Sequence, residues 1–216
     1  LGRDAKDLLC GMCAVSTIVY GSEQGTPSLA SIRKCRTSIS RAIRGDNHRL
    51  RSIDILFTVI LKGHRSDPFQ ALFYDAFLTI RRLLQKNDDL HSLFAEVWAL
   101  RQAKGTHGSS GPVQLLMTTV HKWGWQWIEP FRFLRPGKGE LLFLDQPKQW
   151  FLHQIRDALR RQCWANIVSP PDGRKPRDDM RGLDIIDIEA STALMRDKVD
   201  RDWRLSPYQK GLLVSI

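Results

Sequence analysis

The sequence is poor in cysteine and has no long apolar run. Four cysteines among 216 residues are too few for the disulfide framework of a small secreted protein. No stretch approaches the roughly 20 apolar residues that span a bilayer, and the first residues do not resemble a signal peptide. We therefore expect an intracellular protein, nuclear or cytoplasmic, that is neither secreted nor inserted in a membrane.

The sequence also lacks the common catalytic motifs. It contains no G-x-S-x-G, no H-E-x-x-H, no P-loop and no G-x-G-x-x-G fingerprint. Tyr74-Asp75 is the closest match to the aromatic–acid pair of a polymerase, but no neighbouring carboxylate is present to help hold metal ions. No partner base or nucleophile is fixed beside His64. We expect no catalytic residue and no cofactor, and a hydrolase that uses one of the histidines is the least favoured alternative.

A metal site is not expected either. Cys10-x-x-Cys13 could begin a zinc site, but the next candidate ligands, Cys35 and His48, are badly spaced for one. Both cysteines of the pair fall inside a helical apolar pattern, where a free cysteine behaves as a small apolar residue.

Positive charge is the most distinctive property of the chain. It holds 33 Lys and Arg against 23 Asp and Glu, a formal net charge of +10, which favours a polyanionic partner such as RNA or DNA. Residues 32–51 contain seven basic residues and one acid, Asp46. A solvated helix face is the plainer explanation, but a run this one-sided suits contact with several phosphates. The candidate nucleic-acid-binding residues are Arg33, Lys34, Arg36, Arg41, Arg44, Arg49 and Arg51.

The apolar spacing predicts a mostly α fold, a multi-helix bundle with one small β-hairpin inserted at about 125–145. Helices are expected over about 8–20, 27–45, 53–62, 68–85, 89–103, 112–123 and 147–164, and again over 187–197 and from 206 onward. The hairpin pairs residues 131–135 with residues 140–144. We divide the chain into a basic helical segment, 1–51, and a helical extension with the hairpin, 52–216.

Residues 61–71, "LKGHRSDPFQA", look like the connection between two helices. Gly63 stands where a helix C-terminal cap belongs. Asp67 is expected to be the N-cap of the next helix, with Pro68 at its first position and Gln70 completing a capping box. His64 and Arg65 are then exposed connector residues.

Trp123, Trp125 and Trp127 alternate along the chain. In an extended segment they share one face, which suits the stacking of unpaired bases. Core packing that anchors the hairpin to the helices is the favoured interpretation, because aromatic side chains dominate core energetics.

Several longer motifs resemble a known family. "STIVYGSE…PSLASIRKCRTSISRAIRG", "LFTVILKGHRSDPFQALFYDAFLTIRRLLQ", "VWALR", "GWQW" and "LSPYQKGLL" resemble the region that follows the reverse-transcriptase palm in LINE-type, non-LTR retrotransposon proteins of the kind found in dinoflagellate genomes. The resemblance extends from about residue 14 to residue 216. It implies that residues 1–51 are thumb-like helices that grip template and primer, with the polymerase palm as their partner. The palm's F/Y-x-D-D carboxylates, an endonuclease and a ribonuclease H segment are not recognisable in this chain.

Three hypotheses follow. The first is a non-catalytic nucleic-acid-binding fragment of a reverse-transcriptase protein. Because the chain starts without methionine and ends within a helical pattern, we expect it to be a piece of something longer. The second is a helical protein-interaction or scaffold module that uses the helix over 68–85. The third is a degraded remnant of the element without present function.

Overall fold

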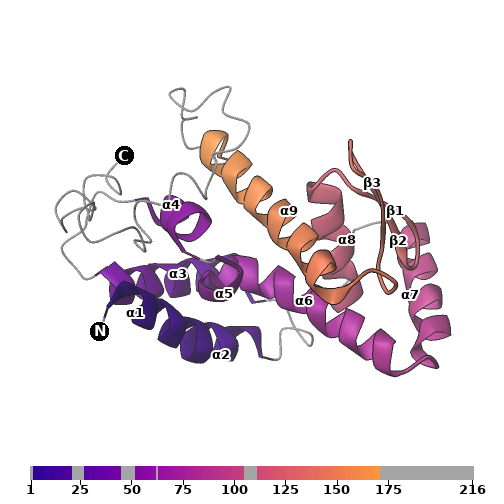
Figure 1. The fold of residues 1–216 in the computed structure, drawn as a ribbon, viewed down its shortest axis with the longest axis horizontal. Coiled ribbons are helices and arrows are strands. Elements are labelled where there is room, and N and C mark those ends of the chain that lie inside the picture. Colours follow the sequence, from indigo (N-terminus) through magenta and orange to yellow (C-terminus); the bar gives the residue numbers. More distant parts are fainter. Residues whose placement is uncertain (1, 21–26, 45–51, 62, 105–110, 171–216) are drawn as a thin grey trace, which may run out of the picture.

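The computed structural model describes residues 2–20, 27–44, 52–61, 63–104 and 111–170 (Figure 1). Its elements in chain order are α1 (Arg3–Leu9), the π-helical η1 (Cys10–Val15), α2 (Ser16–Val19), α3 (Leu29–Arg44), α4 (Ile53–Ile55), the π-helical η2 (Leu56–Ile60), α5 (Gly63–Ser66), α6 (Pro68–Lys86), α7 (Leu90–Lys104), α8 (Pro112–Lys122), β1 (Gln126–Glu129), β2 (Arg132–Arg135), β3 (Gly139–Leu142) and α9 (Lys148–Val168). The predicted fold class, mostly α with a small β-hairpin, is confirmed. The helices predicted over 187–197 and from 206 onward lie outside the described residues.

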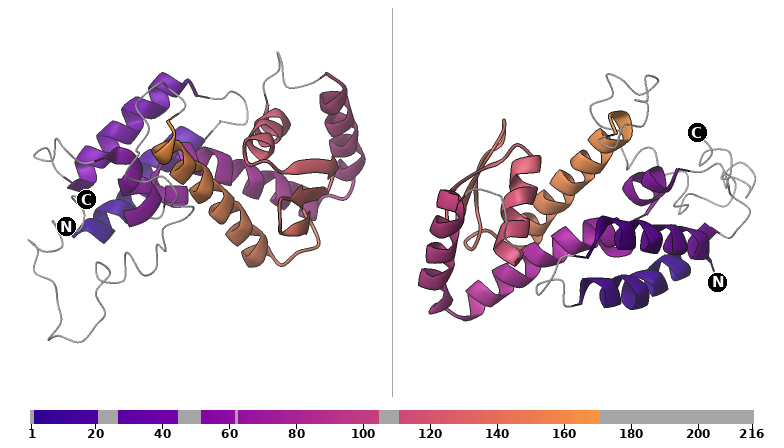
Figure 2. Two further views of the ribbon diagram at one scale, coloured as in Figure 1. Left: turned by 90° about the horizontal axis from the view of Figure 1, so that it is seen from above. Right: turned by 180° about the vertical axis from the view of Figure 1, so that it is seen from behind.

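Helix α6 joins two buried clusters. It begins as the sequence predicts, with Pro68 in its first turn and the Asp67 carboxylate accepting a hydrogen bond from the Phe69 N–H at 3.0 Å. Ala71, near its start, packs with the N-terminal helices, whereas Phe77 packs with the sheet and α9. Figures 1 and 2 accordingly show α6 running from the end that holds α1 to α5 toward the end formed by α7, α8 and the sheet.

The N-terminal cluster contains residues from both sides of the predicted boundary at 51/52. Its buried members are Val15, Val19, Ile39, Ile43, Leu56, Phe57, Leu61 and Ala71. Ser52 begins α4 as a cap, because its hydroxyl accepts a hydrogen bond from the Ile55 N–H at 3.3 Å. The helices before the boundary therefore share one core with η2 and the start of α6.

The predicted hairpin is present, and it carries a third strand. β2 pairs antiparallel with β3, with Phe133 opposite Leu141, and β1 lies on the other side of β2, giving the order β1-β2-β3. Gly137 and Gly139 have φ values of 67° and 71°, a conformation that glycine adopts without steric cost. The alternation of the strands buries Phe133 and Leu141 completely and leaves Leu134 37% exposed.

The segment before α6 differs from its prediction in two ways. Gly63 begins α5 instead of ending the preceding helix, and a Cβ at this position would overlap the Gln70 side chain. Gln70 does not complete a capping box, because the Asp67 N–H donates to the Gly63 carbonyl at 2.9 Å. The Gln70 Nε2 instead donates to Asp67 Oδ2 at 3.4 Å and to the Phe57 carbonyl at 3.5 Å.

Helix α3 also starts later than predicted. The sequence predicts a start at residue 27, but the first helical residue is Leu29. The cause is Ser28, whose hydroxyl accepts a hydrogen bond from the Ser31 N–H at 3.1 Å and so acts as the N-cap.

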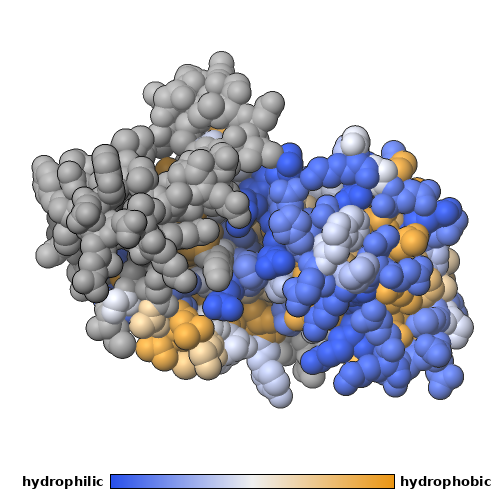
Figure 3. All heavy atoms as spheres, in the orientation of Figure 1, coloured by the Kyte–Doolittle hydropathy of each residue, from blue (hydrophilic) through white to orange (hydrophobic). Residues whose placement is uncertain are grey.

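Some apolar residues at helical spacing lie at the surface. Leu29 is 63% exposed, Leu93 is 55% exposed and Met12 is 63% exposed, and Leu8 and Leu9 are also exposed. Tertiary neighbours cover only part of each stripe, so α1 and η1 leave an apolar patch visible in Figure 3. No helix in the described part of the chain is long and apolar enough to cross a membrane.

We predict that the sheet face that packs into the core stabilises the protein far more than the outer face. Phe133→Ala should lower the free energy of unfolding by about 3–5 kcal/mol, the usual cost of emptying a buried aromatic site. Leu134→Ala, on the adjacent and exposed position, should change it by less than about 1 kcal/mol. Denaturant titrations of both variants measure the difference, and equal decreases would contradict the observed register.

Candidate nucleic-acid interface

Helix α3 carries a single sign of charge. Its 16 residues, "LASIRKCRTSISRAIR", include five basic residues and no acid. Arg41 and Arg44 lie in the last turn, where positive charge interacts favourably with the helix dipole. The helix is amphipathic because Ile32, Ile39 and Ile43 recur at helical spacing, and all three are buried.

Packing divides the five basic residues of α3 into two groups. Arg33, Lys34 and Arg41 are exposed to solvent, whereas Arg36 and Arg44 are half-buried. Lys34 and Arg41 are seven residues apart and so lie on one side of the helix, about 10 Å from each other along its axis. This exposed side is the part of the predicted site that can meet a phosphate backbone. Arg49 and Arg51 lie outside the described residues.

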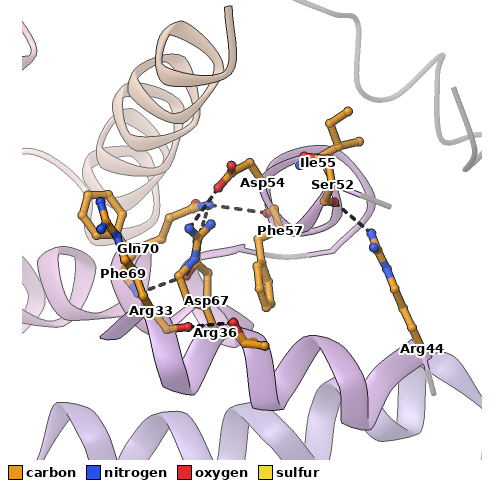
Figure 4. A network of polar contacts seen from close by, with 11 residues as sticks. Arg33, Arg36, Arg44, Ser52, Asp54, Ile55, Phe57, Asp67, Phe69 and Gln70 are labelled. Carbon is orange, nitrogen blue, oxygen red and sulfur yellow. Dashed lines mark hydrogen bonds and ion pairs between the residues drawn. The ribbon is translucent and has the colours of Figure 1, made fainter. Parts of the chain in front are cut away.

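Arg36 turns inward and belongs to a buried ion-pair network (Figure 4). Its Nε donates to Asp67 Oδ1 at 2.8 Å and its Nη2 to Asp67 Oδ2 at 3.1 Å, the two-bond geometry that suits a guanidinium. Its Nη1 lies 2.9 Å from Asp54 Oδ1, and the guanidinium stands 5.4 Å from the centre of the Phe57 ring. Asp67 is completely buried.

This network gives Arg36 a structural role that the charge pattern of the sequence did not predict. Burial by itself lowers the pKa of Arg36, but the negative charges of Asp67 and Asp54 outweigh burial and hold that pKa above its usual value. The guanidinium is therefore charged and already held by two carboxylates. The half-buried Arg36 side chain thus holds α3 to its neighbours, and its contact with phosphates stays a prediction.

Arg44 is likewise turned toward the protein. Its Nη2 donates to the Ser52 carbonyl at 3.2 Å, which ties the last turn of α3 to the residue that caps α4 (Figure 4). The bond gives Arg44 a structural contact that the charge pattern of the sequence did not predict.

The three alternating tryptophans pack in the aromatic core. Trp123 stacks on Phe77 with ring centres 5.4 Å apart, and Trp125 meets Trp123 edge-on at 5.0 Å. Trp127 is only 8% exposed, with its ring 4.9 Å from that of Phe133. These contacts are those of the core packing favoured from the sequence, and base stacking by the three tryptophans stays a prediction.

His64 and Asp75, the other residues considered for catalysis, contact neighbouring side chains. His64, predicted to be an exposed connector residue, is half-buried with its ring 4.9 Å from the Tyr74 ring, and burial raises the pKa of Tyr74. Asp75 Oδ2 accepts a hydrogen bond from the Thr79 hydroxyl at 3.5 Å within α6. Among the described residues, no three His, Cys, Asp or Glu side chains come together in a way that could hold a metal ion.

Folding brings one further lysine to α3. Lys122, at the end of α8, lines the same cavity as Arg33 of α3 and Gln162 of α9. These residues come from widely separated parts of the chain, so no local pattern of sequence could have grouped them.

Comparison with known proteins adds no relative. No protein-family model, curated protein or solved structure matches the chain. The resemblance to LINE-type reverse-transcriptase proteins stays a prediction from the motifs quoted above.

We predict that Arg36 and Arg33 differ sharply in their contributions to stability. Arg36→Met should lower the free energy of unfolding by about 3–5 kcal/mol, because it leaves the buried Asp67 carboxylate without its cation. Arg33→Met, on the exposed side of the same helix, should change it by less than about 0.5 kcal/mol. Denaturant unfolding followed by circular dichroism measures both, and a mild effect at Arg36 would show that the ion pair does not stabilise the fold.

We also predict that two cysteine thiols differ in reactivity. Burial raises the pKa of Cys163 to about 12, with the charge of Asp67 acting in the same direction. At pH 8 roughly one Cys163 thiol in 10,000 is then ionised and able to react. Cys13 is exposed, so iodoacetamide should label Cys13 in the folded protein and reach Cys163 only after unfolding. Peptide mass spectrometry reads out both sites, and rapid labelling of Cys163 in the native protein would contradict its burial.

Proposed function

We propose that the chain is a non-catalytic nucleic-acid-binding part of a retroelement reverse-transcriptase protein. In this proposal α3 grips RNA or DNA through its phosphates, and polymerisation belongs to a palm outside these 216 residues. The observation that carries the proposal is the exposed, purely basic side of α3, with Arg33, Lys34 and Arg41. The family-like motifs of the sequence support the retroelement part.

Electrostatics explains why such a helix face suits a phosphate backbone. A duplex presents about one negative charge per 1.7 Å of its axis, so two cations about 10 Å apart on α3 can meet different phosphates of one strand. No acidic residue on α3 opposes them. Contacts of this kind position a protein on nucleic acid without selecting a sequence, which agrees with a role in holding template and primer.

The alternative is a helical protein-interaction or scaffold module that uses the helix over 68–85 to bury a partner as well as a core. The sequence suggested that the helix over 68–85 could bury a partner. In the structure, α6 places its large apolar residues, including Phe73, Phe77, Ile80 and Leu84, in the chain's own core. That helix therefore offers little apolar surface to a second protein.

The proposal predicts that charge reversal on α3 weakens binding to every sequence about equally. The variant Lys34→Glu with Arg41→Glu should bind a single-stranded RNA of about 16 nucleotides more weakly than the wild type. The slope of log K against log salt should become shallower by about 0.7 for each phosphate that the variant no longer neutralises. Fluorescence anisotropy over a range of salt concentrations measures both quantities.

A matched control separates a local effect from a change in overall charge. Arg82→Glu with Lys86→Glu alters the formal charge by the same amount at two exposed positions of α6. This control should retain nearly wild-type affinity. An equal decrease in affinity in both double variants, or wild-type binding that does not depend on salt, would refute phosphate binding by α3.

A further inference from the structure

A cavity of about 480 Å³ lies beside the basic helix, between α3, α4, the end of α8 and α9. Its size falls within the roughly 300–1,000 Å³ of pockets that hold small molecules and cofactors. It differs from the exposed phosphate-binding side of α3, because its walls come from several elements and include buried side chains. It borders that side of the helix through Arg33.

Cations outnumber carboxylates among the described residues that line the cavity. Arg33, Arg36 and Lys122 line it, against a single lining carboxylate, Asp54. Arg36 is held by Asp54 and Asp67, so its charge is compensated. The other two lining cations, Arg33 and Lys122, are both exposed. A phosphate group at the mouth of the cavity would therefore lie near two cations from different elements.

Neutral hydrogen-bonding groups lie on the α9 side. Gln162 Oε1 accepts a hydrogen bond from Trp123 Nε1 at 2.8 Å, which fixes the orientation of the amide and so assigns its other end as a donor. Asn166 follows one turn later on α9 and lines the same cavity. Side-chain amides of this kind recognise the edges of nucleic-acid bases through paired donor and acceptor atoms.

The third wall is apolar. Leu29, Ile32 and Phe69 line the cavity, and Phe69 is half-buried. An aromatic ring among aliphatic side chains is a surface on which an unpaired base can stack. The cavity thus combines cations for a phosphate, amides for a base edge and an apolar wall for a base face.

We propose that this cavity takes one unpaired nucleotide from the strand that α3 holds. The inference rests on the proposed function and adds a preference for single-stranded nucleic acid. A base inside a duplex would first have to be unstacked and unpaired, at a cost of a few kcal/mol. A single strand offers its bases without that cost. The exposed side of α3 would then serve both kinds of strand, and the cavity only one.

The test fills the cavity without substituting a charged residue. Ala165 lines the cavity and is exposed on α9, so Ala165→Phe should block entry while leaving the core intact. Asn166→Leu removes the amide at nearly constant size. Ala99→Phe, on an exposed position of α7, is the matched control for an added surface phenyl ring. Thermal unfolding of each variant checks that it folds.

Binding is measured by anisotropy with the full 216-residue chain, on a labelled single-stranded RNA and on the blunt duplex of the same sequence. Ala165→Phe should weaken single-strand binding about tenfold, as expected when one base can no longer stack, and should leave duplex binding unchanged. Asn166→Leu should shift binding in the same direction by a smaller factor, and Ala99→Phe should alter neither.

The outcomes distinguish the two proposals. Suppose that wild-type binding depends on salt, but that Ala165→Phe weakens binding to neither RNA, or to both RNAs equally. That result would overturn the nucleotide cavity and leave the proposed α3 interface in place. Wild-type protein that binds neither RNA would overturn the proposed function and the cavity with it.

Discussion

The buried ion pair between Arg36 and Asp67 is the interaction on which the arrangement of the helices depends. The Asp67 carboxylate caps α6 through the Phe69 N–H and also accepts two hydrogen bonds from Arg36 of α3. Arg36 in turn reaches Asp54 of α4. Three helices therefore meet at one cluster of three charged side chains. Separating either partner would leave a charge buried without compensation, which is strongly unfavourable.

The same ion pair sets the direction in which the rest of α3 faces. With Arg36 directed into the protein and Ile32, Ile39 and Ile43 buried, the rotation of the helix about its axis is fixed. Lys34 and Arg41 are then left on the solvent side. A run of positive charge is thus divided by packing into residues that stabilise the fold and residues that are exposed to a polyanion.

Helix α6 connects the N-terminal cluster to the aromatic core at the other end of the molecule. Its early residue Ala71 belongs to the N-terminal cluster, and Phe77 lies at the centre of the aromatic core with Trp123, Phe133 and Phe151 around it. The tryptophans that alternate in the sequence are part of this core. Their contribution is to hold the sheet and α8 against α6, and Trp123 also orients Gln162 at the cavity.

Within the described residues, local sequence was enough to establish most of the helices, the hairpin and the cap at Asp67, because backbone hydrogen bonding and capping involve residues only a few positions apart. It was also enough to locate the basic helix. Tertiary contacts alone established that Arg36 faces inward and that Leu29 lies at the surface. The face that a helix buries depends on partners from distant parts of the chain. Asp67, which holds Arg36, lies 31 positions away, beyond the reach of any periodic pattern.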